Sequence, residues 1–445
     1  MADVACLAPL IDPDRQRPAI AFYMHDLSGG GVERMRLALA AALMARGVDV
    51  TLVLHARRGA LLASLPPGLR VVELGGARTA LDLPALVRFL RRARPDLLVS
   101  SLGHNNVVAL LARALAGGGT RLVICQHNAL SREAAEMPGL GYRALPLLYR
   151  GLHLLADRVV AVSGGVAEDL ARVAGIPRGR ISVIHNPVIG PDFVRRAEGP
   201  PPHPWFTDGR GPVFVSAGRL VPQKDPETLL RAFALMAPRG EGARLMLLGE
   251  GPMRPALEGL ARELGIAGRV CFAGFRPNPL PYIRHAAALV LASRYEGLGN
   301  VLIEALGCGT PVISTDCPFG PAEILQGGRF GDLVPVGDAL GLAAAMADTP
   351  RRRFPAEALR QRAAAFSVDR AAEAHLALLA AFSVGARRGA LPLDPAGAGR
   401  PQTPLRLADS LVTSGRLQNN RGLGPLAPAG SRGGAPHAAA PEHAA

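Results

Sequence analysis

Two glutamates in the second half of the sequence have the type and spacing to bind a ligand rich in hydroxyl groups. Glu296 and Glu304 are separated by seven residues and follow an apolar stretch at 288–293. The residues directly after the first glutamate are Gly297, Leu298, Gly299 and Asn300. Carboxylates accept hydrogen bonds from sugar or ribose hydroxyls, and free loop amides at a helix N-terminus favour phosphate. We expect a strand, a loop holding Glu296, and a short helix that Asn300 caps and that carries Glu304; a purely structural capping segment is the alternative.

Two cations follow another apolar stretch of the second half. Arg219 lies near the end of the run 213–220, and Lys224 is the only lysine in an arginine-rich sequence. Asp225 and Pro226 are typical of an N-cap and a first helical residue. Both cations would then lie just before a helix N-terminus, where phosphate is favoured. The alternative is a pair of solvated surface cations.

Two further turns of the second half lie at expected strand ends. Gly249 and Glu250 could line the same site, or form an ordinary turn between a strand and a helix. Phe275 and Arg276 end the run 270–276, where a nucleotide base could lie against the loop.

The first half offers a glycine-rich turn and two histidines. Gly30 and Gly31 follow the first strand and open a helix, so their amides could approach an anion. The run is not GxGxxG, and His55 stands where a dinucleotide-binding fold would place an acidic residue. His104 and His127 end neighbouring strands, although single histidines are more often structural.

Composition restricts the class of protein. Hydrophobic residues make up 49% of the 445 residues, which excludes disorder throughout. No uncharged apolar run approaches the roughly 20 residues of a membrane span, and the first residues do not read as a secretion signal. The five cysteines show no paired spacing. We therefore expect a cytoplasmic protein with reduced thiols.

The net charge of +14 favours anionic partners such as nucleotide phosphates, acidic lipid or nucleic acid. Nucleic acid is disfavoured, because aromatic residues are few and basic residues are spread along the chain. Asp12 and Asp14 form a DxD string without companion ligands, so we expect no metal site.

Strand-like and helical runs alternate through both halves, which predicts an α/β protein with parallel sheets covered on both faces. A proline-rich stretch interrupts the alternation at 189–212. We therefore expect two facing Rossmann-like domains, 18–188 and 213–384, with a ligand cleft between their sheet edges. We also expect residues 385–445 to be a disordered, mildly basic tail.

Taken in order, these motifs resemble a retaining glycosyltransferase of family 4 with the GT-B fold. The resemblance covers about residues 18–380, and its most specific part is the segment 293–325 around the two glutamates. This version of the segment resembles bacterial members that extend lipid-linked or cell-surface glycans. The function implied is transfer of a sugar from a nucleotide-sugar, with UDP expected and GDP open, to a glycan or polyprenyl-linked saccharide.

The resemblance also implies roles for the residues. The domain 18–188 would receive the acceptor, and the domain 213–384 would bind the donor, with its last helix packing back on the first domain. Arg219 and Lys224 would hold the diphosphate, and Glu304 would bind the ribose. Glu296 would grip the donor sugar, and His127 would reach that sugar from the facing domain. The remaining donor contacts implied are the amides of 297–300, with Gly30, Gly31, Gly249, Glu250, Phe275 and Arg276.

The implied reaction needs no metal or other cofactor, and the leaving phosphate would deprotonate the acceptor hydroxyl. The acceptor side is less defined, with His104 and His127 as candidates. The stretches 86–95 and 142–158 mix arginine with apolar residues and could lie on an anionic membrane at the inner face of the cytoplasmic membrane; helices packed on the sheet are the alternative. A nucleotide-sugar epimerase of the same fold and a non-catalytic nucleotide-sugar binder remain the rival functions.

Overall fold

The computed structural model describes residues 17–28, 30–76, 78–136, 139–236, 242–349 and 354–388. Asp12 and Asp14 lie outside the described residues, and so does the expected tail from residue 389 onward.

Seven parallel strands form the sheet of the first domain, in the order β3-β2-β1-β4-β5-β6-β7. The strands are β1 (Ala19–Met24), β2 (Asp49–Leu54), β3 (Arg70–Glu73), β4 (Leu97–Ser101), β5 (Arg121–Gln126), β6 (Arg158–Ala161) and β7 (Ile181–Val183). The strand order reverses between β1 and β4, and ligands of such sheets bind beyond the carboxyl ends of the strands at this point.

Alternate residues of β1 enter different apolar layers, which is why the sequence of this strand is apolar throughout. Ile20, Phe22 and Met24 belong to one buried cluster, and Ala21 and Tyr23 belong to the other. A parallel strand buried on both faces requires this pattern.

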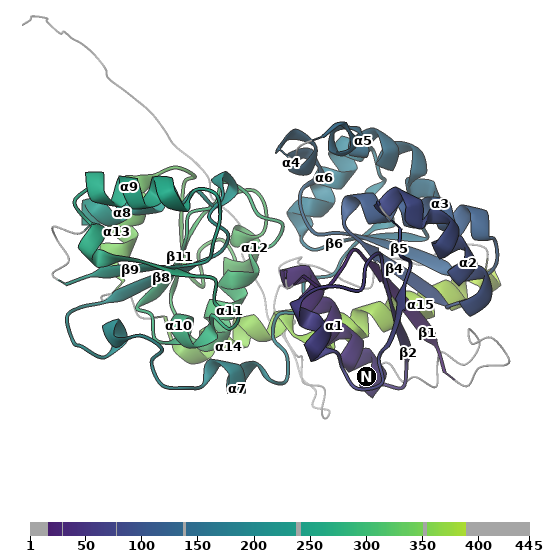
Figure 1. Ribbon diagram of the computed structural model, residues 1–445, viewed down its shortest axis with the longest axis horizontal. Helices are drawn as coiled ribbons and strands as arrows, with labels where there is room; N and C mark the ends of the chain where they lie inside the picture. Colours follow the sequence, from purple (N-terminus) through teal and green to yellow (C-terminus); the bar gives the residue numbers. More distant parts are fainter. Residues whose placement is uncertain are drawn as a thin grey trace, which may run out of the picture. The chain divides into compact units, whose positions relative to one another are not determined.

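Helices cover both faces of the sheet (Figure 1). They are α1 (Gly31–Ala45), α2 (Leu83–Ala93), α3 (Gly103–Ala116), α4 (Leu130–Glu136), α5 (Leu140–Leu152) and α6 (Gly164–Ala174), with the short 3-10 turns η3 (Thr79–Asp82) and η4 (His153–Leu155).

The second domain has six parallel strands in the order β10-β9-β8-β11-β12-β13. They are β8 (Val213–Ala217), β9 (Arg244–Leu248), β10 (Val270–Gly274), β11 (Ala288–Leu291), β12 (Val312–Thr315) and β13 (Asp332–Val334). This is the Rossmann order, with its reversal between β8 and β11. The prediction of two Rossmann-like α/β domains is confirmed.

The helices of the second domain connect these strands. They are α8 (Pro226–Met236), α9 (Arg254–Glu263), α10 (Leu280–Arg284), α11 (Asn300–Cys308), α12 (Pro321–Leu325), α13 (Ala339–Asp348) and α14 (Ala356–Ala363), with the 3-10 turn η7 (Pro222–Lys224) before α8.

Two segments connect the domains. The stretch 189–212 contains α7 (Phe193–Ala197), and its Ile189 pairs with Ser367 in a parallel bridge. The last helix, α15 (Val368–Arg388), packs on α1 and adds side chains such as Leu376 and Leu379 to the core of the first domain. The helix α15 ends at Arg388, so it extends slightly past residue 385, near which the tail was expected to begin.

Candidate active site

A buried ion pair lies where the strand order of the second domain reverses. Lys224, at the end of η7 after β8, donates from Nζ to Oε1 of Glu296, which follows β11, over 2.5 Å. The Oγ of Ser293 donates to the same carboxylate oxygen over 2.6 Å. The side chain of Glu296 is only 7% exposed, whereas that of Lys224 is 22% exposed. The ammonium therefore holds the carboxylate while keeping one side open to a ligand.

Hydrogen bonds between the two loops fix the pair in place. Gln223 donates from Nε2 to the carbonyl oxygen of Tyr295 (3.1 Å), and its own carbonyl accepts from the amide of Arg294 (2.8 Å). Arg294 Nε also pairs with Asp225 at 3.1 Å. The Oδ1 of Asp225 accepts from the amide of Thr228 at 3.5 Å, in line with the expected cap of α8.

Arg219 and Lys224 line one small pocket at the carboxyl end of β8. Arg219 is exposed and forms no ion pair with any described residue. An exposed guanidinium next to a partly exposed ammonium gives this pocket a positive rim that suits a diphosphate.

The glycines of the next turn allow two loops to approach closely. A Cβ at Gly249, whose φ is +150°, would lie 1.9 Å from the carbonyl oxygen of Gly218, and one at Gly251 would lie 2.2 Å from that of Leu220. The turn therefore supports the backbone around Arg219. The side chain of Glu250 pairs instead with Arg254, the first residue of the following helix α9, and a donor contact for Glu250 stays a prediction.

The expected capping role of Asn300 was wrong. The N-cap of α11 is Gly299 (φ +93°), which has no side chain, and Asn300 is the first helical residue. Its Oδ1 accepts from Nδ2 of Asn186 at 2.9 Å, and its Nδ2 lies 3.3 Å from Sδ of Met35. Both partners belong to the first domain, so the side chain of Asn300 connects the two domains and does not accept a hydrogen bond from the backbone amides of its own helix.

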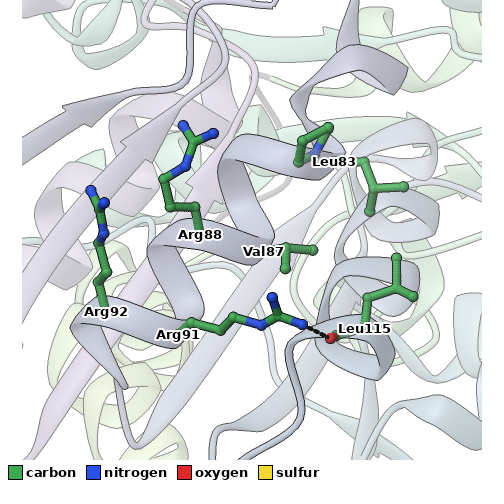
Figure 2. Close-up of a pocket in the computed structure, with 7 residues that line it drawn as sticks. Leu83, Val87, Arg88, Arg91, Arg92 and Leu115 are labelled. Carbon is green, nitrogen blue, oxygen red and sulfur yellow. Dashed lines mark hydrogen bonds between the residues drawn. The ribbon is translucent and has the colours of Figure 1, made fainter.

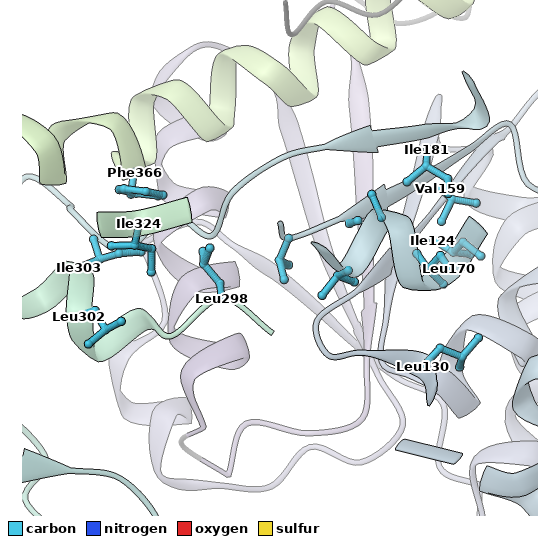
Figure 3. Packing of buried hydrophobic residues seen from close by; sticks show 14 of the residues in the cluster. Ile124, Leu130, Val159, Leu170, Ile181, Leu298, Leu302, Ile303, Ile324 and Phe366 are labelled. Atoms are coloured by element: carbon cyan, nitrogen blue, oxygen red, sulfur yellow. The ribbon is translucent and has the colours of Figure 1, made fainter. Parts of the chain in front are cut away.

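An apolar cluster fixes the orientation of α11. Leu298, Leu302 and Ile303 lie against Ile324 and Phe366 within a buried cluster that continues into the first domain (Figure 3). The buried side chain of Leu298 thus anchors the loop 297–300, and contact of the loop amides with a donor stays a prediction.

Glu304 lies on α11 and differs from Glu296 in its surroundings. It is half-buried and forms no hydrogen bond with a described residue. Burial raises the pKa of Glu304 to about 7, against the opposing positive charges of Arg196 and Arg34. A carboxylate left without donors in such a place suits ligand hydroxyls.

The glycine-rich turn of the first domain lies beside α11. A Cβ on Gly31 would lie 3.6 Å from Nδ2 of Asn300, whereas Gly30, the N-cap of α1, lies against its own helix at Glu33. Arg34 donates to the carbonyl oxygen of Pro277 over 2.6 Å. The structure therefore brings the turn to the same place as the glutamate segment, as the sequence suggested.

His127 reaches the second domain through its backbone. A Cβ on Gly297 would lie 1.9 Å from the carbonyl oxygen of His127, so only glycine fits there. The imidazole is enclosed in a small cavity between α1 and α15, and neither ring nitrogen forms a well-formed hydrogen bond to a described residue. Burial lowers the pKa of His127 to about 3, which keeps the ring neutral. Contact of this ring with the donor sugar stays a prediction.

The remaining predicted residues are His104, Phe275 and Arg276, and none of them forms a hydrogen bond or ion pair with Lys224 or Glu296 in the described chain. His104 is in the first turn of α3, and its ring packs against the ring of Tyr142 in α5 at a centroid distance of 4.3 Å. Phe275 is 59% exposed just beyond β10, and Arg276 lies over the ring of Tyr282. An exposed aromatic ring at a strand end remains suited to a base.

Sequence reasoning missed the polar contacts that connect the domains. The carboxylate of Glu323 accepts from the amide of Gly164 (2.8 Å) and lies 2.5 Å from Nε2 of His185. Ser163 Oγ donates to the carbonyl oxygen of Gly297 over 2.7 Å. The only signal in the sequence was the position of Glu323 after a Gly-Pro helix start.

A buried polar network at the ends of β1 and β2 was also missed. Asp82 is fully buried and accepts from Tyr23 Oη at 2.7 Å, and His55 Nδ1 lies 2.9 Å from both of its oxygens. The ring of His25 stacks on that of His55, and burial lowers the pKa of His25. The separation of these residues along the sequence gave no indication that they meet.

The described ranges contain neither a cluster of metal-ligating side chains nor a membrane-spanning helix. No group of three or more His, Cys, Asp or Glu side chains there could hold a metal ion. No helix among the same residues is long and apolar enough to cross a bilayer.

Comparison with known proteins identifies the family. The model of Glycosyltransferase Family 4 matches residues 29–189, and the model of Glycosyl transferases group 1 matches residues 211–349. The lipopolysaccharide core biosynthesis glycosyltransferase LpsE of Rhizobium meliloti is 30% identical over 334 residues, which cover 73% of this chain and 86% of the relative. A 4-alpha-N-acetylgalactosaminyltransferase of Campylobacter jejuni, named for a diphospho-undecaprenol-linked saccharide, is 30% identical over 273 residues, which cover 60% of this chain and 71% of the relative.

Solved structures share the fold. HepE of Anabaena, in complex with UDP and glucose, superposes with a TM-score of 0.68 at 22% identity, over 82% of this chain and 99% of its own. A glycosyltransferase of Rickettsia africae gives a TM-score of 0.69 at 17% identity, over 82% and 98%. The two matched models, the extent of the match to LpsE and the two facing Rossmann-like domains show that this chain belongs to the glycosyltransferases of group 1 and family 4 and is a GT-B enzyme.

Proposed function

We propose that this glycosyltransferase moves a sugar from a UDP-sugar to a saccharide of an envelope glycan or to a lipid-linked saccharide. The family fixes the kind of reaction, and the relatives suggest the substrates. LpsE is named for lipopolysaccharide core biosynthesis, the Campylobacter enzyme for an undecaprenol-linked acceptor, and HepE was crystallised with UDP.

The observation that carries the proposal is the set of charges at the reversal of β8 and β11. Lys224 holds Glu296 in a fixed position, and Arg219 adds a second positive charge to the same pocket. Charge builds on the leaving diphosphate in the transition state, and fixed cations stabilise that charge more than the ground state. Glu296 would accept from the hydroxyls of the donor sugar, and Glu304 from those of the ribose.

We further propose that transfer retains the configuration at the anomeric carbon and requires no bound cation. The acceptor oxygen forms its bond on the face from which the diphosphate leaves, and the acceptor proton passes to an oxygen of that diphosphate. Arg219 and Lys224 would supply the positive charge that stabilises the leaving group.

Purified full-length protein offered UDP-, GDP- and ADP-sugars tests the donor. We expect saturable release of UDP alone, equal rates with and without a chelator, and an α-linked product from an α-linked donor by NMR. Release of another nucleotide, loss of activity in the chelator, or an inverted product would each contradict the matching part of the proposal. The control is Arg231→Ala, which removes an exposed cation of α8 away from the pocket.

A further inference from the structure

One side of the first domain exposes leucines that a water-facing surface would rarely carry. The exposed fractions are 81% for Leu140, 75% for Leu147, 64% for Leu154 and 56% for Leu115, and Leu148 and Leu155 are also exposed. They lie on α3, α5 and η4, and α3 contacts α2, α5 and η4, so these elements form one continuous layer on the sheet (Figure 1). We call the outer surface of α2, α3, α5 and η4 the basic leucine face.

The charges on this face have one sign. None of these elements contains an aspartate or glutamate, and each of the exposed arginines lacks an ion pair with any described residue. These arginines are Arg88, Arg91, Arg92, Arg143 and Arg150. Some exposed arginines elsewhere in the described chain do have carboxylate partners, for example Arg172 with Asp169. The unpaired cations make the face complementary to an anionic surface.

A hollow of about 600 Å³ lies between α2 and the end of α3 (Figure 2). Its apolar lining includes Leu83, Val87 and Leu115, and three arginines line it as well. Arg91 donates from a terminal nitrogen to the carbonyl oxygen of Leu115 over 2.8 Å, which holds α2 and α3 together. The guanidinium groups of Arg88 and Arg92 extend from α2 and lie free of the other residues drawn. An apolar hollow with two free cations suits a lipid whose head group is negatively charged.

We propose that the basic leucine face docks this enzyme on a bilayer that contains anionic phospholipid. The leucines enter the interface between head groups and acyl chains, and the arginines contact the lipid phosphates. Clusters of leucine and arginine without any acidic partner fit a lipid surface better than a protein interface, whose core is enriched in aromatic residues and whose rim is mixed in charge. The benefit for transfer rests on the proposed lipid-linked acceptor, whereas the docking itself does not.

The test is sedimentation of the full-length protein with vesicles of phosphatidylcholine alone or mixed with phosphatidylglycerol. Two double variants alter the face: Leu147→Asp with Leu154→Asp, and Arg88→Glu with Arg92→Glu. The matched control carries Leu235→Asp with Arg231→Glu on α8 of the second domain, where both side chains are exposed. Melting temperature and nucleotide release from the donor are measured in parallel, because neither depends on the bilayer.

We expect wild type and control to bind the anionic vesicles and not the neutral ones, and both face variants to bind about tenfold or more weakly. Nucleotide release should be the same in all four proteins. Binding of the face variants to anionic vesicles as strong as that of the wild type would overturn the proposal. This outcome includes the case in which the residues beyond 388 alone are responsible for vesicle binding. Absence of vesicle binding by the wild type would also overturn it. So would a dimeric wild type and a monomeric leucine variant, since the face would then bind a second copy of the protein. Loss of nucleotide release in every protein would instead refute the proposed donor chemistry and leave the docking result intact.

Discussion

Replacing Lys224 with alanine separates the catalytic and the structural contributions of one side chain. The change removes the ammonium that lies 2.5 Å from Oε1 of Glu296 and leaves Ser293 as the remaining donor to that oxygen. Removing one partner of a buried ion pair costs about 3–5 kcal/mol, because the other charge stays buried. Since 22% of the lysine side chain is exposed, water can partly replace it, and we expect about 3 kcal/mol of destabilisation.

Turnover of Lys224→Ala should fall further than its lower stability can explain. Removal of a fixed cation that stabilises a leaving diphosphate typically lowers turnover by about 10²–10³. The assay is UDP release at saturating donor, with thermal unfolding followed on the same preparations. The double variant Lys224→Met with Glu296→Gln provides a neutral pair of similar size, which should recover stability but not turnover.

Arg219→Ala provides the matched comparison, because that side chain is exposed and lacks an ion pair with a described residue. We expect turnover to fall and the melting temperature to stay the same. Near-normal turnover in folded Lys224→Ala would refute the diphosphate role. Recovery of turnover in a Lys224→Met single variant would show that the lysine stem, not its charge, positions Glu296.

Three further predictions concern the loop and helix after Glu296. Binding of a UDP-sugar should tighten about tenfold between pH 6 and pH 8, because the raised pKa of Glu304, about 7, leaves roughly one tenth of this side chain ionised at pH 6. Donor affinity measured by calorimetric titration should lose this pH dependence in Glu304→Gln. An unchanged pH profile in the variant would count against the ribose role. The same raised pKa means that the neutral form stabilises the fold at low pH and that this contribution is lost as the pH rises through 7, so Glu304→Gln should gain stability relative to wild type at pH 8 but not at pH 4. Gly297→Ala would place a Cβ 1.9 Å from the carbonyl oxygen of His127 and should destabilise the protein by about 1–3 kcal/mol and lower turnover. Gly259→Ala, in the middle of α9 with no atom near its Cβ position, is the control and should stabilise slightly; equal melting temperatures for the two variants would disprove the close contact.

Local patterns in the sequence identified most of the elements that hold the site. Apolar runs predicted the strands, and Asp225 followed by Pro226 predicted the start of α8, because capping depends on neighbouring residues alone. Residue type also identified Glu296 and Lys224 as candidates. Their direct contact was not predicted, because it depends on β8 and β11 lying side by side in the sheet.

Contacts between the domains account for what sequence reasoning missed. Asn300 has the type of a capping residue, yet Gly299 takes the cap in a left-handed conformation and Asn300 bonds to Asn186. The need for glycine at position 297 comes from the backbone of His127, far away in the sequence. Local propensity contains no information about such partners, so a single sequence could not reveal them.

The different surroundings of the two glutamates explain how one short segment can bind two parts of a donor. Glu296 already has two donors, Lys224 and Ser293, and its position is therefore set before any ligand arrives. Glu304 has no such partners among the described residues, and burial disfavours its charge. A ligand that brings hydroxyl donors to Glu304 lowers the free energy of its ionised form, so that binding and ionisation favour each other. The segment thus combines a preorganised carboxylate near the diphosphate pocket with a second one that becomes charged when the ligand supplies the missing hydrogen bonds.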